Sequence, residues 1–428
     1  MRDRKGLQEE IRMSLREEIE ILCSDARAAS AKLALCDTEK KNAAIRHIAE
    51  ALVREEKKII EANALDLAAA EENGVTPAMR DRLAINKDRI TAMRDSLYAL
   101  CNLEDPVGRS ECWERPSGIK ISRVRVPLGV VAIIYEARPN VTVDSAALCL
   151  KTGNAVVLRG GKEAINTNTA IVEVIKGALD ECGIDPHSVE LIRSVDRESA
   201  NILMTMRGYI DVLIPRGGKG LIRNVVDNAK VPVIETGAGN CHLYVDEDAD
   251  LEMATKVTIN AKCSRPSVCN AIETLLVHAS VAPKLLPDLG RELREHGVEL
   301  RGCPRACVLL PEAIAATEED YFTEYNDYIL AIKVVDTLTD AIDHVNTHST
   351  GHSEAIISNN AESSERFLRE VNSAAVYVNA STRFTDGGEF GFGAEIGIST
   401  QKLHVRGPMG LEALTTEKYM IRGEGAVR

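Results

Sequence analysis

The sequence of 428 residues is longer than one ordinary domain, so two or three domains are expected. Apolar residues make up 45% of the chain and charged residues 27%, as in soluble globular proteins. The net charge of −13 argues against nucleic acid or an anionic membrane surface as the main partner, and no apolar run reaches the roughly 18 residues of a membrane span.

Cysteine usage and the start of the sequence indicate a cytoplasmic protein. The eleven cysteines are an odd number without the paired spacing of a disulfide framework, which is typical of reduced thiols. The chain is charged from Arg2 onward and shows no apolar segment of a signal peptide.

Two groups of potential metal ligands have unsuitable surroundings. Cys303 and Cys307 lie four residues apart, but no second ligand pair follows them. Three histidines are also spaced by four residues, yet the sequence Ser-Thr-Gly between the second and the third should end any helix. These three histidines are His344, His348 and His352. We therefore expect no metal site at either group.

The first 104 residues or so are predicted to be helical. Apolar residues recur there at spacings of three and four, as from Ile45 to Leu52. The pattern changes further on: residues 118–126 alternate apolar and basic side chains like a half-exposed strand, and residues 129–135 form a dense apolar strand.

Beyond residue 135, short apolar runs alternate with helical segments such as Ala164–Cys182. This alternation predicts an α/β fold with parallel sheets that are covered by helices on both faces. The tail, residues 410–416, is predicted to return to strand. The candidate strands are Ala155–Arg159, Val189–Arg193, Ile210–Ile214, Val231–Ile234, His242–Val245, Thr274–Val277, Ile329–Val335, Glu354–Ser358 and Ala375–Asn379.

Two turns that follow predicted strands combine glycines with cations. Arg216, Gly217 and Gly218 lie between a strand and a helix, where backbone N–H groups and the helix dipole suit a phosphate. Arg159 and Lys162 end an earlier strand, where two cations suit an anion such as the 2′-phosphate of NADP. The first turn matches neither the P-loop nor the dinucleotide motif, and an ordinary turn is the alternative for each.

The segment 260–271 contains two cysteines among basic and small residues. A thiolate forms near neutral pH beside a positive charge or a helix dipole, and Lys262 and Arg265 supply such a charge. Ser267 is small enough to leave a neighbouring sulfur open to a substrate. A buried structural cysteine is the alternative, and the local sequence alone does not decide.

Glu235 follows a predicted strand and opens the glycine-rich turn 236–240. A carboxylate in such a position is a candidate general base. A structural carboxylate that caps the turn is an equally good interpretation.

Five stretches occur in an order that is known from one family. They are Tyr-Glu-Ala-Arg-Pro-Asn at 135–140, Ile-Pro-Arg-Gly-Gly at 214–218, Glu-Thr-Gly-Ala-Gly-Asn-Cys-His at 235–242, Arg-Pro-Ser-Val-Cys-Asn-Ala at 265–271 and Gly-His-Ser-Glu-Ala-Ile at 351–356. The chain thereby resembles the aldehyde dehydrogenase superfamily and, within it, the glutamate-5-semialdehyde dehydrogenases, also called gamma-glutamyl phosphate reductases. The resemblance runs from about residue 20 to the end.

The resemblance implies an aldehyde dehydrogenase-like α/β fold with three parts. Residues 1–115 and 129–240 would form a Rossmann-like cofactor-binding domain, and residues 241–403 a catalytic domain. Residues 116–128 and 404–428 would form a β-flap that joins copies of the chain, because an exposed strand edge is usually covered by a partner. The implied partners are other copies of the chain in a homo-oligomer, and glutamate 5-kinase.

The family's pattern also implies the site residues. Cys269, not Cys263, stands at the position of the nucleophile, and Glu235 is a second catalytic candidate. Asn140 is a third, because it lies where the superfamily has an oxyanion segment, Pro-Trp-Asn, that is absent here. The implied ligands of NADPH are Arg159, Lys162, Arg216, Gly217, Gly218 and Glu324, and those of the substrate are Arg138, Arg265, Arg383 and His352.

The implied reaction is the reduction of L-glutamyl 5-phosphate by NADPH to L-glutamate 5-semialdehyde and phosphate, through a cysteine thioester, in proline biosynthesis. No metal is needed. One alternative is a related aldehyde dehydrogenase that hydrolyses its thioester with water activated by Glu235. The other is a non-catalytic binding protein that retains the fold.

Overall fold

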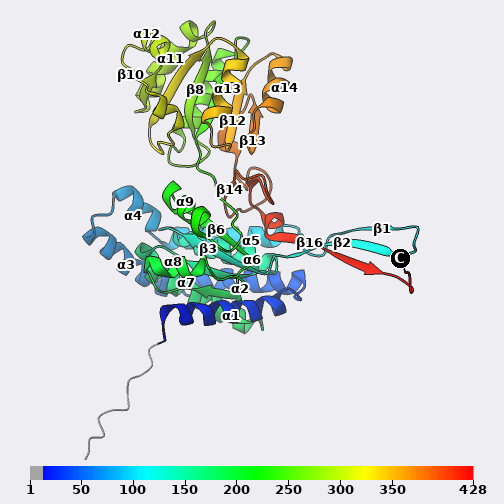
Figure 1. Ribbon diagram of the computed structural model, residues 1–428. Helices are drawn as coiled ribbons and strands as arrows, with labels where there is room; N and C mark the ends of the chain where they lie inside the picture. The colour runs from blue at the N-terminus through cyan, green and yellow to red at the C-terminus, as the bar shows by residue number, and fades with distance from the viewer. Residues whose placement is uncertain (1–12, 428) are drawn as a thin grey trace, which may run out of the picture. The chain divides into compact units, whose positions relative to one another are not determined.

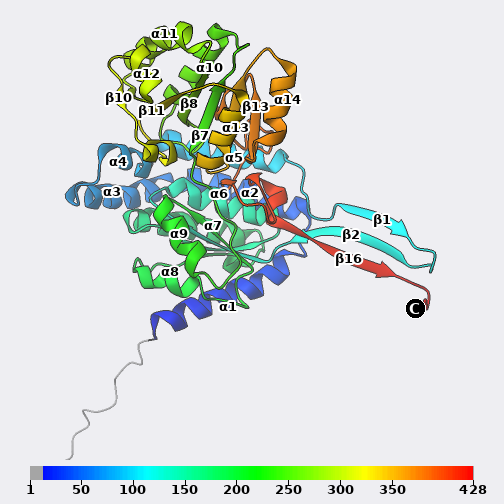
Figure 2. The same ribbon diagram turned by 45° about the horizontal axis from the view of Figure 1, so that its top comes forward.

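The protein is described here from a computed structural model, which covers residues 13–427 (Figures 1 and 2). It divides into two compact units. The first contains the chain up to Ile234, together with Gly393–Ile396 and the segment from Gly410 onward. The second contains Glu235–Phe392 and Gly397–Met409, so the chain leaves the first unit close to the boundary expected at residue 240.

The first unit contains a four-stranded parallel sheet in the order β5-β4-β3-β6. All residues of β3 are buried, which explains the uninterrupted apolar run in its sequence. The strand order reverses at β3, because β4 and β5 continue on one side of it and β6 lies on the other. The strands are β3 (Val130–Tyr135), β4 (Ala155–Arg159), β5 (Val189–Leu191) and β6 (Val212–Arg216).

Several helices of the first unit begin at capping residues that the sequence shows plainly. Ser14 and Glu17 form a capping box at the start of α1, and Asp37 caps α2. The apolar stripe from Ile45 to Leu52 is buried on α2, so the predicted helical layer is confirmed. The helices are α1 (Leu15–Leu33), α2 (Thr38–Arg54), α3 (Glu56–Glu72), α4 (Pro77–Leu83), α5 (Lys87–Asn102), α6 (Pro139–Lys151), α7 (Ile165–Glu181), α8 (Arg197–Leu203) and α9 (Lys219–Asn228), with the 3₁₀ turns η1 (Lys162–Ala164), η2 (Pro186–Ser188) and η5 (Leu411–Leu414).

The second unit is built on a seven-stranded parallel sheet in the order β10-β9-β11-β8-β7-β12-β13. Two apolar clusters pack against it, and Tyr244 stacks on Phe367 in one of them. The strands are β7 (Cys241–Val245), β8 (Ile272–His278), β9 (Glu299–Gly302), β10 (Ile314–Ala315), β11 (Ile329–Val335), β12 (Ser353–Ile357) and β13 (Ala375–Val378). A separate antiparallel pair is formed by β14 (Ile398–Ser399) and β15 (Gly407–Pro408).

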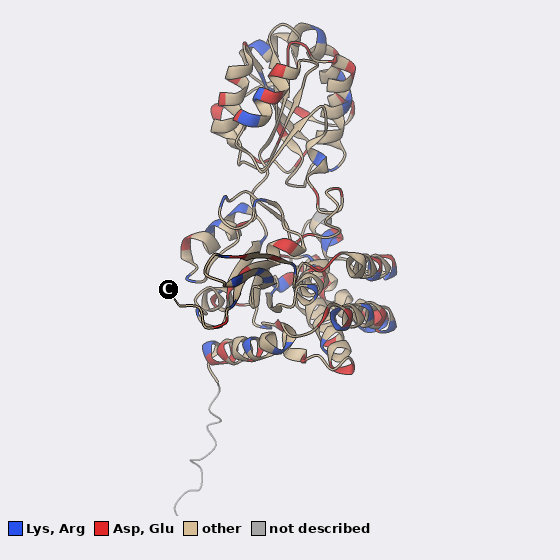
Figure 3. Ribbon diagram, turned by 90° about the vertical axis from the view of Figure 1, so that its right-hand side faces the viewer, with Lys and Arg blue, Asp and Glu red and all other residues tan. Residues whose placement is uncertain are grey.

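The helices of the second unit alternate with its strands, as the sequence predicted. They are α10 (Leu251–Cys263), α11 (Ala282–Glu295), α12 (Pro304–Leu309), α13 (Leu338–His348) and α14 (Ala361–Glu370), with the 3₁₀ turns η3 (Glu318–Phe322) and η4 (Thr382–Phe384). Basic and acidic residues alternate along the helix ribbons of both units in Figure 3. Within the described part of the chain, no helix has the length and apolar character needed to cross a membrane.

Three details differ from the sequence-based prediction. Residues 231–234 form only an isolated parallel bridge between Leu213 and Val233, because Pro232 has no N–H to extend a ladder. Residues 411–414 form a 3₁₀ turn, and the last strand begins only at Thr415. The strands β1, β9, β10, β14 and β15 were not predicted; β9 has four residues and β10, β14 and β15 have two each, which carry too little periodicity.

A three-stranded antiparallel sheet joins two distant parts of the sequence (Figures 1 and 2). It consists of β1 (Ser110–Glu114), β2 (Lys120–Pro127) and β16 (Thr415–Arg422). Trp113, Ile121 and Ile421 lie in one row across the three strands. The rings of Tyr419 and Trp113 meet edge to face, with their centroids 6.3 Å apart. Trp113, Tyr419 and Ile421 are 40%, 54% and 60% exposed, so the sheet presents an apolar face to solvent.

We predict that a second copy of the chain covers this face, because exposed apolar faces and strand edges of this kind mark interaction sites. Replacing Ile421 and Tyr419 by lysine should shift the protein toward monomer, as measured by light scattering or sedimentation velocity. Val308→Lys, at an exposed apolar position of the second unit, should leave the mass unchanged. A wild-type protein that is monomeric at micromolar concentration would contradict the prediction.

Candidate active site

Three parallel strands of the second unit begin at one edge of its sheet and define the candidate site. Cys241 pairs with Ile272, and His242 pairs with Glu354, so the first residues of β7, β8 and β12 lie side by side. The segments that lead into these strands therefore meet there. They include the turn 235–240, the cysteine segment 264–271 and His352. Ligands of open α/β sheets more often bind at the opposite, carboxyl edge.

Cys269 lies in the loop between α10 and β8, and it is partly exposed. The backbone of Gly239 packs directly against it. A Cβ on Gly239 would overlap the carbonyl group of Cys269 and lie 2.5 Å from its Cα, so only glycine fits. Cys263, by contrast, is the last residue of α10 and burial raises the pKa of its thiol. Of the two cysteines, Cys269 is therefore the one that stands in the glycine-lined loop.

Cys241 and His352 lie behind the backbone of Cys269. The thiol of Cys241 donates to the carbonyl oxygen of Cys269 at 3.1 Å, and burial raises the pKa of Cys241 well above its usual value, so the thiol keeps its proton. His352 is fully buried, with its Nδ1 3.7 Å from Sγ of Cys241 and 2.8 Å from Oγ of Ser353. Contact of His352 with a substrate stays a prediction, and in this structure it lines the interior side of the loop.

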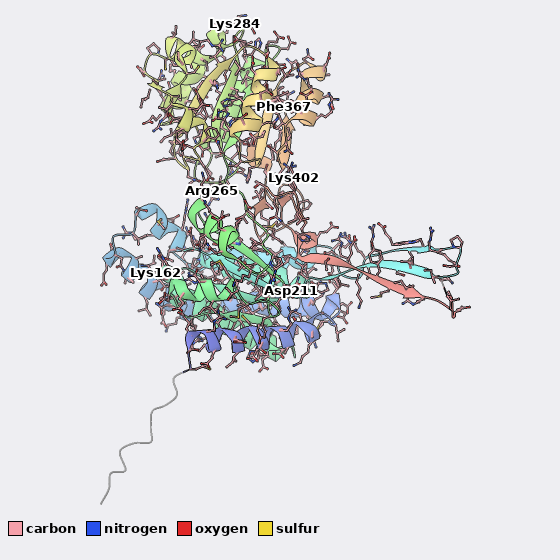
Figure 4. The ribbon with its side chains drawn as sticks, viewed as in Figure 1. Lys162, Asp211, Arg265, Lys284, Phe367 and Lys402 are labelled. Carbon is pink, nitrogen blue, oxygen red and sulfur yellow. The ribbon has the colours of Figure 1, made fainter. Side chains whose placement is uncertain are left out.

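Two arginines gather around Cys269. Arg383 donates from Nε to Oγ of Ser264 at 3.1 Å and from Nη1 to Oδ1 of Asn270. Burial and the nearby charge of Arg265 lower the pKa of Arg383, whereas Cys269 raises it, so Arg383 is close enough to interact electrostatically with both. Arg265 is exposed at the opposite end of the second unit from Lys284 (Figure 4).

A buried ion pair ties the two ends of the cysteine segment together. Nζ of Lys262, at the end of α10, lies 2.5 Å from Oε2 of Glu273 in β8, and both side chains are buried. Burial raises the pKa of Glu273 to about 7, against the opposing influence of Lys262. Glu273 also accepts the N–H of Asn326 at 3.1 Å. Removing one partner of such a pair leaves an uncompensated buried charge, so the pair holds α10 and β8 in fixed register.

Glu324 lies near this ion pair, because its charge contributes to the raised pKa of Glu273. Its Oε1 accepts the N–H of Gly239 at 2.8 Å, so the carboxylate lies beside the backbone that packs on Cys269. Asn326 has a φ of 56°, in the left-handed region that asparagine tolerates. Glu324, which is predicted to contact the cofactor, thus lies next to the backbone that packs on the candidate nucleophile.

The turn that contains Glu235 is fixed by the β14–β15 region. The N–H of Glu235 donates to Oε1 of Gln401 at 2.9 Å, and the N–H of Gly237 donates to the carbonyl of Ile398 at 2.9 Å. Glu235 is partly exposed. Its role as a general base stays a prediction.

The three regularly spaced histidines do not share one helix. His344 and His348 stack on α13 with ring centroids 3.9 Å apart, and the helix ends at His348, as the sequence predicted. Nζ of Lys333 lies 3.1 Å from Nδ1 of His344. The lysine therefore occupies the place that a metal ion would need beside this nitrogen. Among residues 13–427, no group of three His, Cys, Asp or Glu side chains is placed to hold a metal ion.

The first unit carries the predicted phosphate-binding turn at the carboxyl edge of its sheet. Arg216 ends β6 and pairs with the last residue of β3, so the turn lies where the strand order reverses, the usual ligand position in such sheets. A Cβ on Gly217 would lie 2.6 Å from the carboxyl carbon of Glu136, and the N–H of Gly218 donates to Glu136 at 3.2 Å. An anion at the start of α9 would compete with Glu136 for this N–H.

Arg159 and Lys162 differ in their surroundings. Arg159 donates to the carbonyls of Val195 and Asp196, both at 3.0 Å, and to Oγ of Ser199 at 3.3 Å. Burial lowers the pKa of its guanidinium group. Arg159 therefore holds the loop before α8, whereas the exposed Lys162 is the freer of the two cations (Figure 4).

Arg138 and Asn140 lie at the start of α6 in the first unit, and both are exposed. The amide of Asn140 donates to Oδ2 of Asp144 at 3.2 Å, and burial raises the pKa of Asp144 to about 6. The roles of Arg138 and Asn140 in catalysis and substrate binding stay predictions.

Sequence reasoning missed three residues that shape the site. Gly239 was read only as part of a turn, although its lack of a side chain is what admits Cys269. Asn270 was noted only as part of the motif at 265–271 and Glu273 was not singled out, so their buried contacts were not foreseen. A polar residue directly beside a candidate nucleophile, and a carboxylate inside an apolar strand, were the available signals.

Comparisons with known proteins agree with this architecture. The model of the aldehyde dehydrogenase family matches residues 7–300 and 322–416. A gamma-glutamyl phosphate reductase from Heliobacterium modesticaldum is 57% identical, over 97% of this chain and 100% of its own length. The crystal structure of a gamma-glutamyl phosphate reductase from Thermotoga maritima is 51% identical, with a TM-score of 0.94 over 96% of this chain and 100% of that one.

A more distant structure shares the fold alone. An engineered glycolyl-CoA reductase with bound NADP+ is 16% identical, with a TM-score of 0.67 over 94% of this chain and 96% of that one. The predicted aldehyde dehydrogenase-like α/β fold is thus confirmed. By the extent of both matches, the chain belongs to the gamma-glutamyl phosphate reductases of the aldehyde dehydrogenase family.

Proposed function

We propose that this chain reduces L-glutamyl 5-phosphate to L-glutamate 5-semialdehyde and phosphate, with NADPH as the reductant and Cys269 as the nucleophile. The names of the relatives support the acyl phosphate as substrate. The observation that carries the proposal is the placement of a partly exposed cysteine beside Arg265 and Arg383. Such a group joins a nucleophile to a binding site for a leaving phosphate. The reaction would serve proline biosynthesis in the cytoplasm.

The proposed chemistry begins at Cys269. Its thiolate attacks the acyl carbon, the C–S bond forms, and the bond from that carbon to the phosphate oxygen breaks. The phosphate dianion leaves toward Arg265 and Arg383, whose guanidinium groups suit its oxygens. The N–H of Cys269 is the proposed donor to the carbonyl oxygen that gains charge during the attack. This divides one difficult displacement into two easier steps.

NADPH, when bound, supplies the hydride that reduces the thioester carbon. The residues of the first unit fit such a group, because a glycine pair, a helix N-terminus and the reversal of strand order coincide at Arg216–Gly218. When a phosphate is bound, the N–H of Gly218 would donate to it instead of to Glu136. On the protein side, release of the aldehyde returns the sulfur of Cys269 to its thiolate form.

The first prediction concerns the nucleophile. Cys269→Ser should lower turnover by roughly a thousandfold or more, because the thioester can no longer form. Cys263→Ser should keep most of the activity, since that thiol ends a helix away from the glycine contact. Steady-state assays with both variants, with peptide mapping after iodoacetamide labelling, make the comparison. Substantial activity in folded Cys269→Ser protein would refute this role.

The second prediction concerns phosphate. In the reverse direction, NADP+ reduction by glutamate semialdehyde should require inorganic phosphate or arsenate and saturate with it. Arg383→Lys should raise the apparent KM for phosphate by about tenfold, as expected for losing one charge-assisted hydrogen bond, with little change in that for NADP+. Glu235→Gln should keep phosphate-dependent activity, because no water must be activated.

The opposite result has a defined meaning. Phosphate-independent oxidation of the semialdehyde to glutamate, lost in Glu235→Gln, would establish the hydrolytic reaction instead. Absence of any turnover in the wild-type protein with either substrate pair would favour the non-catalytic binding protein.

The third prediction concerns the cofactor. Lys162→Ala should raise the KM for NADPH several-fold while leaving that for NADH nearly unchanged, because only NADPH carries a 2′-phosphate for an exposed cation to bind. Lys162 is the cleaner test, since Arg159 also holds the loop before α8. Lys284→Ala, at the surface of the second unit, is the matched control (Figure 4). Equal effects on NADPH and NADH would mean that Lys162 does not read the 2′-phosphate.

A further inference from the structure

Asn270 directly follows Cys269, and its side chain forms a two-way bridge to η4. It is only 5% exposed. Its Oδ1 accepts from Nη1 of Arg383, while its Nδ2 donates to the carbonyls of Arg383 at 3.2 Å and of Thr385 at 3.0 Å. Its own carbonyl accepts from Oγ1 of Thr382 at 2.7 Å. One side chain thus fixes both the backbone and the guanidinium of Arg383 relative to the nucleophile.

A second anchor holds the other edge of the same guanidinium. Nε of Arg383 donates to Oγ of Ser264 at 3.1 Å, and that hydroxyl donates to the carbonyl of Asn260 at 2.7 Å. An arginine side chain carries about 2 kcal/mol of rotamer entropy, so holding it at two points before a ligand arrives lowers the entropy lost on binding.

Both anchors are neutral, which leaves the charge of Arg383 available. Among the described residues, Arg383 forms no ion pair, and its Nη2 makes no hydrogen bond. A structural arginine in a partly buried position is usually paired with a carboxylate. Asp386 is near enough to raise the pKa of Arg383, and its Oδ1 accepts the N–H of Gly388. The direct contacts of the guanidinium are nonetheless an amide and a hydroxyl, beside Cys269 and Arg265, which gives Arg383 the properties of a preformed anion site.

We propose that Asn270 is a positioning residue that aims Arg383 at the phosphate leaving from Cys269. The inference rests on the proposed function and deepens it. Only an amide serves both contacts, because it accepts from the guanidinium and donates to two carbonyls while remaining uncharged. Aspartate in this place would neutralise Arg383 and lose both donated hydrogen bonds, and alanine would release the guanidinium.

The test uses phosphate-dependent NADP+ reduction by glutamate semialdehyde. Asn270→Ala should raise the apparent KM for phosphate by about tenfold, because a charge-assisted hydrogen bond loses its alignment. The KM for NADP+ should stay within about twofold. Equal rises in both constants, or no rise for phosphate, overturn the inference. A wild-type protein without phosphate-dependent activity would instead overturn the proposed function.

A double-mutant cycle separates positioning from general structural damage. If Asn270 acts through Arg383, then adding Asn270→Ala to Arg383→Ala should cause no further rise in the KM for phosphate. Independent, multiplying effects would overturn the inference. Asn346→Ala is the matched control, because its amide also bridges two backbone groups, Asn372 N–H and the carbonyl of Glu370, far from Cys269 in the sequence.

Ser264→Ala covers the case in which Asn270→Ala does not fold. Ser264 is exposed, so its replacement leaves the core intact. It should raise the KM for phosphate by about threefold, the size of one modest neutral hydrogen bond, and should have no effect in the Arg383→Ala background. An unchanged KM for phosphate in Ser264→Ala would overturn the two-anchor arrangement.

Discussion

The parallel pairing of β7 with β8 is the constraint on which the site depends. Because Cys241 is paired with Ile272, the turn before one strand and the cysteine segment before the other end at the same edge. Their backbones then meet at Gly239 and Cys269, at a separation that excludes any side chain on the glycine. The chemistry of Cys269 is thereby set in a frame of main-chain atoms, which vary less in position than side chains.

Buried charges in both units are compensated by specific partners. In the first unit, Lys41 lies 2.6 Å from Asp105, and both side chains are buried. In the second, Lys262 and Glu273 are paired in the same way. Replacing such a pair by apolar residues often costs no stability, so its benefit is in fixing one arrangement of the elements that carry it. For the pair of Lys262 and Glu273, those elements are α10 and β8, which precede and follow Cys269 in the sequence.

The sequence was sufficient for most elements and for the family, because both depend on local pattern. The strands β4 and β11 lie where periodicity predicted them, and α13 ends at His348 as its Ser-Thr-Gly signal required. The contacts of Asn270, Glu324 and Glu136 could not be read in this way, because each reaches a residue distant in sequence. Their partners are defined only by strand register and by the packing of loops at a sheet edge.

The three-stranded sheet has a consequence for how the chain folds during synthesis. Strand β16 follows the whole second unit in the sequence, yet it pairs along the whole length of β2, and Asn154 of the first unit donates to the carbonyl of Leu414 at 2.8 Å. Contacts across so long an interval close late, because the ends of the intervening loop must first meet. The first unit therefore begins to fold from the earliest helices but is completed only after the entire second unit has left the ribosome. A chain arrested before Thr415 exposes the unpaired edge of β2.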